Sequence, residues 1–431
     1  MANNTDNIII GAGLTGLSAA FTLLDQGVRP EDILILEALP RCGGRVHTRA
    51  ENDLLYEYGA QWLHGLPPDN MFYDLLKSRG LAPDYALDTI DTRVVVTADN
   101  TNDETFRQIN ARYLHEAYIS FKADHPDEDI SFKDLAARTG QPSAALLSFF
   151  ITRNWLGLDD PADVSADAYY NDIAAPAGML LKDGMSSLIQ MMERKLTTHG
   201  VHILTGTQIH AVEQTADNVT IRTPDTSYMG ARALITVSAG VLQSGLITFN
   251  PPLQPSIKNY INSLIMGSLT KIFVPLQEDF FVARALQPNT HLNIMMADLP
   301  VFAHIRTNNK PLITLFAAGA NNAHYETASA EDLLSFVRDA FSRFPSLQGF
   351  EPYLKGPISA TGWASDPHFR GAYSNAKPGV KRSDPMIDNR IIFAGEAFNA
   401  PNEKGEENYA TMESAWISGQ KAAALMSCKP S

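Results

Sequence analysis

The sequence predicts an α/β fold of more than one domain, and three observations lead to this prediction. Residues 7–10 and 33–36 are short apolar runs with the length and composition of buried parallel strands. Between them, residues 17–24 form an apolar segment with small side chains, which fits a helix packed closely on a sheet. The chain has 431 residues with 45% hydrophobic content, enough for two domain-sized cores.

A glycine-rich turn joins the first predicted strand to the helix. Gly11, Gly13 and Gly16 have the spacing of a dinucleotide-binding turn, in which glycines allow a tight bend and close approach of the backbone. The N-terminus of the following helix offers free N–H groups to a pyrophosphate. Glu37 ends the second strand, where a carboxylate would accept hydrogen bonds from ribose hydroxyls. The whole unit predicts dinucleotide binding.

The charge balance limits the class of partner. The chain has 34 basic and 48 acidic residues and a net charge of −14, which argues against nucleic acid. A cationic substrate would be attracted, although surplus carboxylates also serve simply to keep a protein soluble.

Cysteine is scarce. Cys42 and Cys428 stand at opposite ends of the chain, so neither a disulfide framework nor a thiolate metal cluster is available. We expect no metal site. The N-terminus does not resemble a signal peptide, and no apolar run approaches the ~20 residues that cross a bilayer. We therefore expect a soluble, cytoplasmic protein without a membrane partner, although a signal peptide that had been removed would leave no trace here.

The segment after Glu37 distinguishes between dinucleotides. Gly43-Gly44-Arg45 resembles the Gly-Gly-Arg segment of flavoproteins with two dinucleotide-binding domains, and plain NAD dehydrogenases lack it. The resemblance implies FAD as cofactor, with Gly44 and Arg45 at the pyrophosphate. A guanidinium suits this role because it gives paired, directional hydrogen bonds. The alternative is a solvated loop arginine.

Residues 59–65 resemble a segment of polyamine oxidases, within the flavin-containing amine oxidases. The resemblance places Ala60, Gln61 and Trp62 beside the flavin ring and His64 in the substrate tunnel. A structural, hydrogen-bonding histidine is the alternative for His64. Amino-acid oxidases usually carry an arginine in this region, so its absence here favours an amine substrate.

Two positions in the middle of the chain carry further expectations. Ile209 matches the position whose backbone contacts adenine. Lys271 stands within residues 266–274, which otherwise read as a buried strand, and a buried lysine needs a reason. In the family, the matching lysine holds a water against the flavin and assists reoxidation or hydrolysis of the imine. The alternative is an edge-strand lysine that reaches solvent.

The C-terminal third resembles the segments that line the reactive face of the flavin. Trp363 is expected to pack on the flavin, or else to be an ordinary core aromatic, and Tyr373 is expected to form one wall of an amine-binding cage. Monoamine oxidases have their covalent flavin cysteine where this chain has Ala372. The resemblance therefore implies a non-covalent FAD.

The last motif joins a strand to a helix. By resemblance, Glu396 binds hydroxyl groups of FAD, and a helix beginning at Thr411 and Met412 points its N–H groups at the flavin. Thr411 stands where monoamine oxidases place a second cage tyrosine, so the cage is expected to be one-sided. The acidic linker at residues 399–408 is either a solvated loop or a source of carboxylates near the site.

The resemblance implies a discontinuous domain organisation. We expect an α/β, Rossmann-like FAD-binding domain from residues 1–70, 182–246 and 385–431. Residues 71–181 and 247–384 are expected to form an α+β substrate-binding domain, with the site between the two.

The implied reaction is oxidation of a carbon–nitrogen bond of a polyamine such as spermine, spermidine or an acetylated form. The imine hydrolyses to an aldehyde and an amine, and O2 is reduced to H2O2. A monoamine oxidase and an L-amino-acid oxidase are alternatives within the class. A non-catalytic FAD-binding subunit is an alternative outside it, against which Lys271 and Tyr373 argue.

Overall fold

The computed structural model describes residues 4–64, 71–89, 92–96, 100–105, 110–171, 177–295, 301–403 and 409–427. The last residue of the 59–65 motif, residues 404–408 of the acidic linker, and Cys428 lie outside these described residues.

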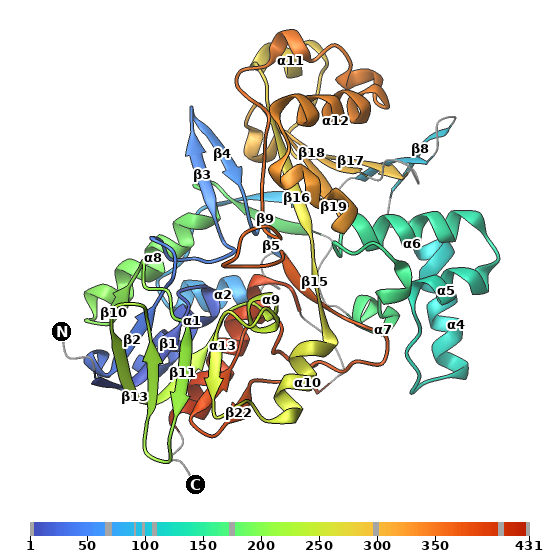
Figure 1. The fold of residues 1–431 in the computed structure, drawn as a ribbon. Coiled ribbons are helices and arrows are strands. Elements are labelled where there is room, and N and C mark those ends of the chain that lie inside the picture. The colour runs from blue at the N-terminus through green and yellow to red at the C-terminus, as the bar shows by residue number, and fades with distance from the viewer. Residues whose placement is uncertain are drawn as a thin grey trace.

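A nine-stranded sheet forms the first half of the molecule (lower half of Figure 1). Its centre is parallel, because β1 pairs in parallel with β2 on one side and with β13 on the other, and β13 pairs in parallel with β23. The strands are β1 (Asn4–Ile10), β2 (Ile33–Leu36), β10 (His202–Leu204), β11 (Ala211–Gln214), β12 (Val219–Arg222), β13 (Ser227–Ile235), β14 (Thr248–Asn250), β22 (Met386–Asp388) and β23 (Ile391–Phe393).

Three helices share a hydrophobic core with this sheet: α1 (Leu14–Asp25), α8 (Met185–Thr198) and α13 (Met412–Ser427). Apolar side chains of β1 and β2 belong to the same core, which explains why those strands read as continuous apolar runs. The predicted α/β class is confirmed.

A seven-stranded sheet forms the second half, with α12 (Ala330–Ser342) and α11 (Glu278–Ala283) beside it at the top of Figure 1. Most neighbouring strands here are antiparallel, unlike the centre of the first sheet. The strands are β7 (Thr92–Val96), β8 (Asn100–Thr105), β16 (Leu269–Pro275), β17 (Thr290–Met295), β18 (Val301–Ile305), β19 (Leu312–Ala318) and β20 (Ser359–Ala360).

Helices α4 (Glu116–Asp124), α5 (Phe132–Thr139), α6 (Pro142–Asn154) and α7 (Ala166–Tyr170) gather on one side of the second half (right of Figure 1). They share a core with Phe302 of β18 and Phe316 of β19. Within the described residues, no helix is both long and apolar enough to cross a membrane.

Smaller sheets connect the two halves. A three-stranded sheet contains β5 (Leu63–His64), β9 (Ala177–Leu181) and β6 (Tyr85–Thr89). Two further pairs complete the strands. One is β15 (Leu264–Gly267) with β21 (Tyr373–Ala376), and the other is β3 (Thr48–Glu51) with β4 (Leu54–Glu57). The domain boundaries given above stay a prediction.

Candidate functional site

One large cavity, of about 960 Å³, brings the predicted site residues together. It begins at the glycine turn after β1 and extends to aromatic side chains of the second sheet. The predicted residues that line it are Gly11, Gly13, Glu37, Gly44, Arg45, Ala60, Gln61, Trp62, His64, Ile209, Lys271, Trp363, Tyr373, Glu396, Thr411 and Met412. Gly16 does not line the cavity.

The glycine turn has the shape that a phosphate group requires. A Cβ atom on Gly16 would lie 2.1 Å from the carbonyl oxygen of Gly11, so only glycine lets α1 approach β1 so closely. At Gly13, by contrast, a Cβ atom would meet nothing within 4 Å, and α1 begins there without a side-chain cap. Backbone N–H groups at an uncapped helix N-terminus are suited to bind a pyrophosphate.

Glu37 stands at the end of β2 and is already hydrogen-bonded by the protein. Its Oε2 atom accepts from the backbone N–H of Ala12 at 2.7 Å, and its Oε1 atom accepts from that of Leu39 at 2.9 Å. Burial raises the pKa of this carboxyl, while the two backbone hydrogen bonds oppose the shift. The carboxylate is thereby fixed in place beside the glycine turn, as the dinucleotide prediction requires.

Arg45 and Glu396, both predicted to bind FAD, bind each other in this structure. The Nη1 atom of Arg45 lies 2.9 Å from Oε1 of Glu396 and also donates to the carbonyl of Ala372. Ser374 donates to the same carboxylate from its hydroxyl at 2.7 Å. Burial alone would raise the pKa of Glu396, but Arg45 and Arg382 lower it, so the carboxylate is charged.

Lys271 of β16 is buried beside the cavity with all three donors of its ammonium occupied. Its Nζ atom donates to the carbonyl oxygens of Glu57 at 2.9 Å and Gly59 at 2.8 Å, and to Oε1 of Gln61 at 2.9 Å. The lysine does not reach solvent, which excludes the edge-strand alternative. A water bound to Nζ, as the resemblance implies, would have to replace one of these three contacts.

Burial shifts the pKa of Lys271 and the pKa of its neighbour Glu57 in opposite directions. It lowers the pKa of Lys271 to about 7, while the charge of Glu57 opposes the change. It raises the pKa of Glu57 to about 7, against hydrogen bonds from Thr48 and Met185 and the charge of Lys271. Burial thus favours the neutral form of both groups, while the attraction between them favours the charged forms.

Gln61 was predicted to contact the cofactor, but its amide connects Lys271 to a second buried cluster. Its Oε1 atom accepts from Lys271, and its Nε2 atom lies 2.6 Å from Nδ1 of His304. Because an amide nitrogen only donates, Nδ1 of His304 accepts. Burial lowers the pKa of His304 well below its usual value, so this ring is neutral.

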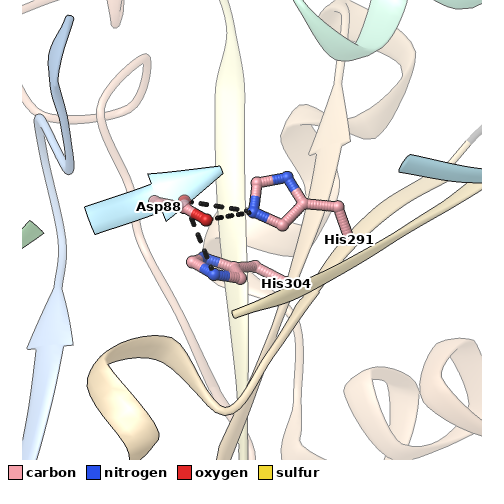
Figure 2. Close-up of side chains that lie close together, drawn as sticks. All are labelled: Asp88, His291 and His304. Atoms are coloured by element: carbon pink, nitrogen blue, oxygen red, sulfur yellow. Dashed lines mark hydrogen bonds and ion pairs between the residues drawn. The ribbon is translucent and has the colours of Figure 1, made fainter. Parts of the chain in front are cut away.

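The second cluster is Asp88, His291 and His304, which Figure 2 shows close together. Both oxygens of Asp88 lie 3.1–3.2 Å from Nε2 of His291, and Nε2 of His304 is 3.9 Å from Oδ2. The indole of Trp62 also donates to Oδ2 at 2.6 Å. All three cluster residues are at most 1% exposed.

Sequence reasoning missed this cluster. Asp88 lies on β6, His291 on β17 and His304 on β18, so no local motif joins them. The available signal was weak: His304 interrupts the apolar strand β18, whereas β17 mixes polar and apolar residues around His291. Buried polar side chains in strands need partners. These side chains are also of types that ligate metals and lie within 4.8 Å of one another, so the expected absence of a metal stays a prediction.

Tyr373 and Trp363 line the cavity, and the backbone holds their polar atoms. The hydroxyl of Tyr373 donates to the carbonyl of Trp155 at 2.6 Å, and burial raises the pKa of this phenol. The indole of Trp363 donates to the carbonyl of Tyr58 at 2.8 Å. The rings therefore act as fixed walls, since hydrogen bonds of this kind restrain their orientation.

The C-terminal motif forms the helix start that was predicted. Helix α13 begins at Met412, and the Thr411 hydroxyl accepts from the N–H of Ser414 at 3.0 Å, which makes Thr411 its cap. His64 lines the cavity, and its backbone N–H donates to Glu413 of the same helix. Ile209 is 7% exposed at the opposite, dinucleotide end. The chemical roles of these residues stay predictions.

Comparison with known proteins assigns the chain to a family. Residues 14–427 match the family described as flavin containing amine oxidoreductase. The chain belongs to this family. FAD is therefore its cofactor, in agreement with the glycine turn, and the chain is by family an FAD-dependent amine oxidoreductase.

Individual relatives of this flavin amine oxidoreductase are distant. Polyamine oxidase 2 of Arabidopsis thaliana is 26% identical, over 90% of this chain and 82% of the relative. Lysine-specific histone demethylase 1 homolog 1 of Oryza sativa subsp. japonica is 25% identical over 97% of this chain. The chain spans about half the length of that demethylase, namely 52%.

Solved structures establish the same fold over nearly the whole chain. A double mutant of putrescine oxidase superposes with a TM-score of 0.77 at 17% identity, covering 98% of this chain and 99% of that one. Cyclohexylamine oxidase from Brevibacterium oxydans IH-35A gives a TM-score of 0.74 at 21% identity, covering 98% of each chain. At these identities the likeness concerns the fold alone.

Proposed function

We propose that this flavin amine oxidoreductase oxidises a carbon–nitrogen bond of a polyamine and passes the electrons to O2. The observation that carries the proposal is the position of Lys271, buried where the dinucleotide end of one cavity meets an aromatic end. The names of relatives that cover most of this chain, such as polyamine oxidase 2, support a polyamine. The net charge of −14 favours a cationic substrate.

Each part of the cavity has a task in this proposal. Bound FAD supplies the acceptor for two electrons from the substrate. The ring walls of Tyr373 and Trp363 exclude water and orient the amine, and Lys271 holds residues 57–61 in place against the cavity. Because the reacting nitrogen must be neutral, whereas aliphatic amines are mostly protonated at pH 7, activity should rise toward alkaline pH.

A small apolar amine is the second candidate, and one observation favours it. Among the described residues that line the cavity, only Glu37 and Glu396 are acidic, and both lie with the dinucleotide-binding elements. The aromatic end is lined mainly by rings and amides, which suit an uncharged carbon skeleton. Cyclohexylamine oxidase is one of the structural neighbours.

The test is the visible flavin spectrum of the purified protein under anaerobic conditions. Spermine, spermidine, acetylated polyamines, putrescine, phenethylamine, cyclohexylamine and several L-amino acids are added separately. Bleaching by a polyamine, followed by H2O2 release when air is admitted, is the expected result. Faster bleaching by cyclohexylamine supports the second candidate. No bleaching by any compound would favour a non-catalytic FAD-binding subunit.

A further inference from the structure

Arg382 is a buried arginine that lies just outside the cavity and binds Ser374. It is 4% exposed, and it does not line the cavity. Its Nη1 atom donates to the hydroxyl of Ser374 at 3.0 Å, and its Nη2 atom donates to the carbonyl oxygen of the same residue at 2.9 Å. Its Cζ atom lies 4.0 Å from the ring centre of Tyr409. These contacts hold the guanidinium in one orientation.

Ser374 connects this arginine to Glu396 in the cavity wall. Its hydroxyl accepts from Arg382 and donates to Oε2 of Glu396 at 2.7 Å. Its backbone N–H also donates to Oε1 of the carboxylate at 3.2 Å. On the cavity side, Nη1 of Arg45 lies 2.9 Å from the same Oε1 atom. The carboxylate is therefore held between two arginines, one that lines the cavity and one that does not.

The charges of these side chains do not cancel. Glu396 is 6% exposed, and burial alone would raise its pKa, but Arg45 and Arg382 lower it. The carboxylate is therefore negative, while both guanidinium groups are positive, since arginine stays protonated in proteins. Two positive charges share one negative charge, so the cluster keeps a net positive charge. With Arg45 alone, the pair would be neutral and would attract an anion only weakly.

Arg45 has donors left for such an anion. Its bonds to Glu396 and to the carbonyl of Ala372 both use Nη1. Its Nε and Nη2 atoms make no hydrogen bond with the residues that the structure describes, and Arg45 lines the cavity. Arg382, by contrast, directs both terminal nitrogens at Ser374 and does not reach the cavity. The surplus charge is therefore available to a ligand in the cavity through Arg45.

We propose that Arg382 is a positioning residue for FAD, which balances the charge of Glu396 from outside the cavity and leaves the charge of Arg45 for the pyrophosphate. The pyrophosphate is an anion, so its binding depends on the net positive charge of the cluster. If residue 382 were neutral, Glu396 would offset Arg45, and the carboxylate would repel the cofactor. The inference concerns FAD, so it goes beyond the proposed function and holds whichever amine is the substrate.

The experiment measures the dissociation constant of FAD in Arg382→Gln. Glutamine keeps an amide donor for Ser374 but removes the charge. The holoenzyme is equilibrated at low salt, where charges are least screened, and free FAD is separated by ultrafiltration and measured by its fluorescence. We expect the dissociation constant to rise at least about tenfold. Arg382→Lys keeps the charge and should stay within about threefold of the wild type. Lys381→Gln removes an exposed neighbouring charge and should leave the constant unchanged.

A double variant tests whether the loss comes from an unbalanced carboxylate. Glu396→Gln, added to Arg382→Gln, makes the cluster net positive again and keeps an amide oxygen as acceptor. It should recover most of the lost affinity for FAD. A loss caused by disturbed packing would instead stay or increase when a second buried residue is changed.

Four outcomes would overturn the inference. If Arg382→Gln binds FAD as tightly as the wild type, Glu396 needs no second arginine. If the double variant binds FAD no better than Arg382→Gln, the role of Arg382 is structural. An equal loss in Lys381→Gln would assign the effect to the overall charge of the protein. If Arg382→Gln does not fold, Arg382→Lys decides, since a folded Arg382→Lys protein with a loss of about tenfold would show that charge at this position is not what FAD binding requires.

Discussion

At the scale of single residues, Lys271 lines the cavity and also holds part of the cavity wall in place. Its ammonium holds the carbonyl oxygens of Glu57 and Gly59 and the amide of Gln61, so one side chain fixes the segment that leads to Trp62. A buried ammonium with three acceptors is satisfied in hydrogen bonding, but burial still disfavours its charge.

Replacing Lys271 with Met tests its role in the reaction. Methionine keeps similar length and apolar volume but removes the charge and the donors. We expect turnover, or the reoxidation of reduced flavin, to slow at least about tenfold, with FAD still bound, as measured by stopped-flow absorbance. Lys258→Met, on the exposed face of α10 (Pro255–Ser263), should behave as wild type. Normal turnover in the Lys271 variant would show that the lysine is only structural.

The same lysine predicts a pH dependence of stability. Its pKa is about 7 in the folded protein, below the ordinary value of 10.5, so the unfolded chain binds one more proton between these values. Stability must then rise with pH in this window, by on the order of 1 kcal/mol per pH unit. Urea unfolding at pH 8, 9 and 10 should show this rise in the wild type and a smaller one in Lys271→Met. Parallel curves would mean that the folded lysine is protonated throughout.

At the scale of elements, α13 positions its N-terminus at the cavity by packing against α1. A Cβ atom on Gly419 of α13 would lie 2.3 Å from the carbonyl oxygen of Thr15 in α1, so the two helices meet through a glycine. The hydroxyl of Ser18 in α1 also donates to the carbonyl of Trp416 at 2.8 Å. The start of α13, with Thr411 and Met412, is thereby fixed relative to the glycine turn.

Gly419→Ala should therefore weaken FAD binding although residue 419 does not line the cavity. The added methyl group must push the helices apart, and overpacking of this kind costs about 1–3 kcal/mol. We expect the dissociation constant of FAD, measured by fluorescence titration, to rise roughly tenfold. Ala424→Ser adds one heavy atom at an exposed position of the same helix and should leave it unchanged. Equal affinity in both variants would mean that the helices tolerate the separation.

The predictability of these elements depends on how local their contacts are. The unit of β1, α1 and β2 was predicted from sequence because each strand, the glycine turn and Glu37 follow one another along the chain. His291 and His304 could not be joined in this way, since they meet only because β17 and β18 pair with these residues opposite each other. Asp88 reaches them from a different sheet. Likewise, sequence reasoning selected Arg45 and Glu396 separately, but only the fold shows that they pair.

At the scale of the whole molecule, the cavity is lined by parts of the chain that lie far apart in the sequence. Its walls include Gly13 near the N-terminus, Lys271 in the second sheet and Met412 near the C-terminus. A ligand that contacts all of these walls binds the folded state and not the unfolded chain, so it must stabilise the whole fold.

Removal of FAD should therefore lower the thermal midpoint by several degrees, and re-addition should restore it. At a concentration of FAD about 100 times its dissociation constant, binding adds ~2.7 kcal/mol to the free energy of unfolding. Differential scanning fluorimetry of the apoprotein with increasing FAD would measure the shift. A midpoint that does not depend on FAD concentration would mean that the walls are equally well formed without the cofactor.

The pairing of β13 with both β1 and β23 has a consequence for biosynthesis. Strand β1 cannot pair with β13 until residues 227–235 have been synthesised, and β13 cannot pair with β23 until residues 391–393 have been synthesised. Helix α13, which follows, completes the flavin end of the cavity. A ribosome-bound chain therefore has no finished cofactor site until residues 412–427, which form α13, have been translated.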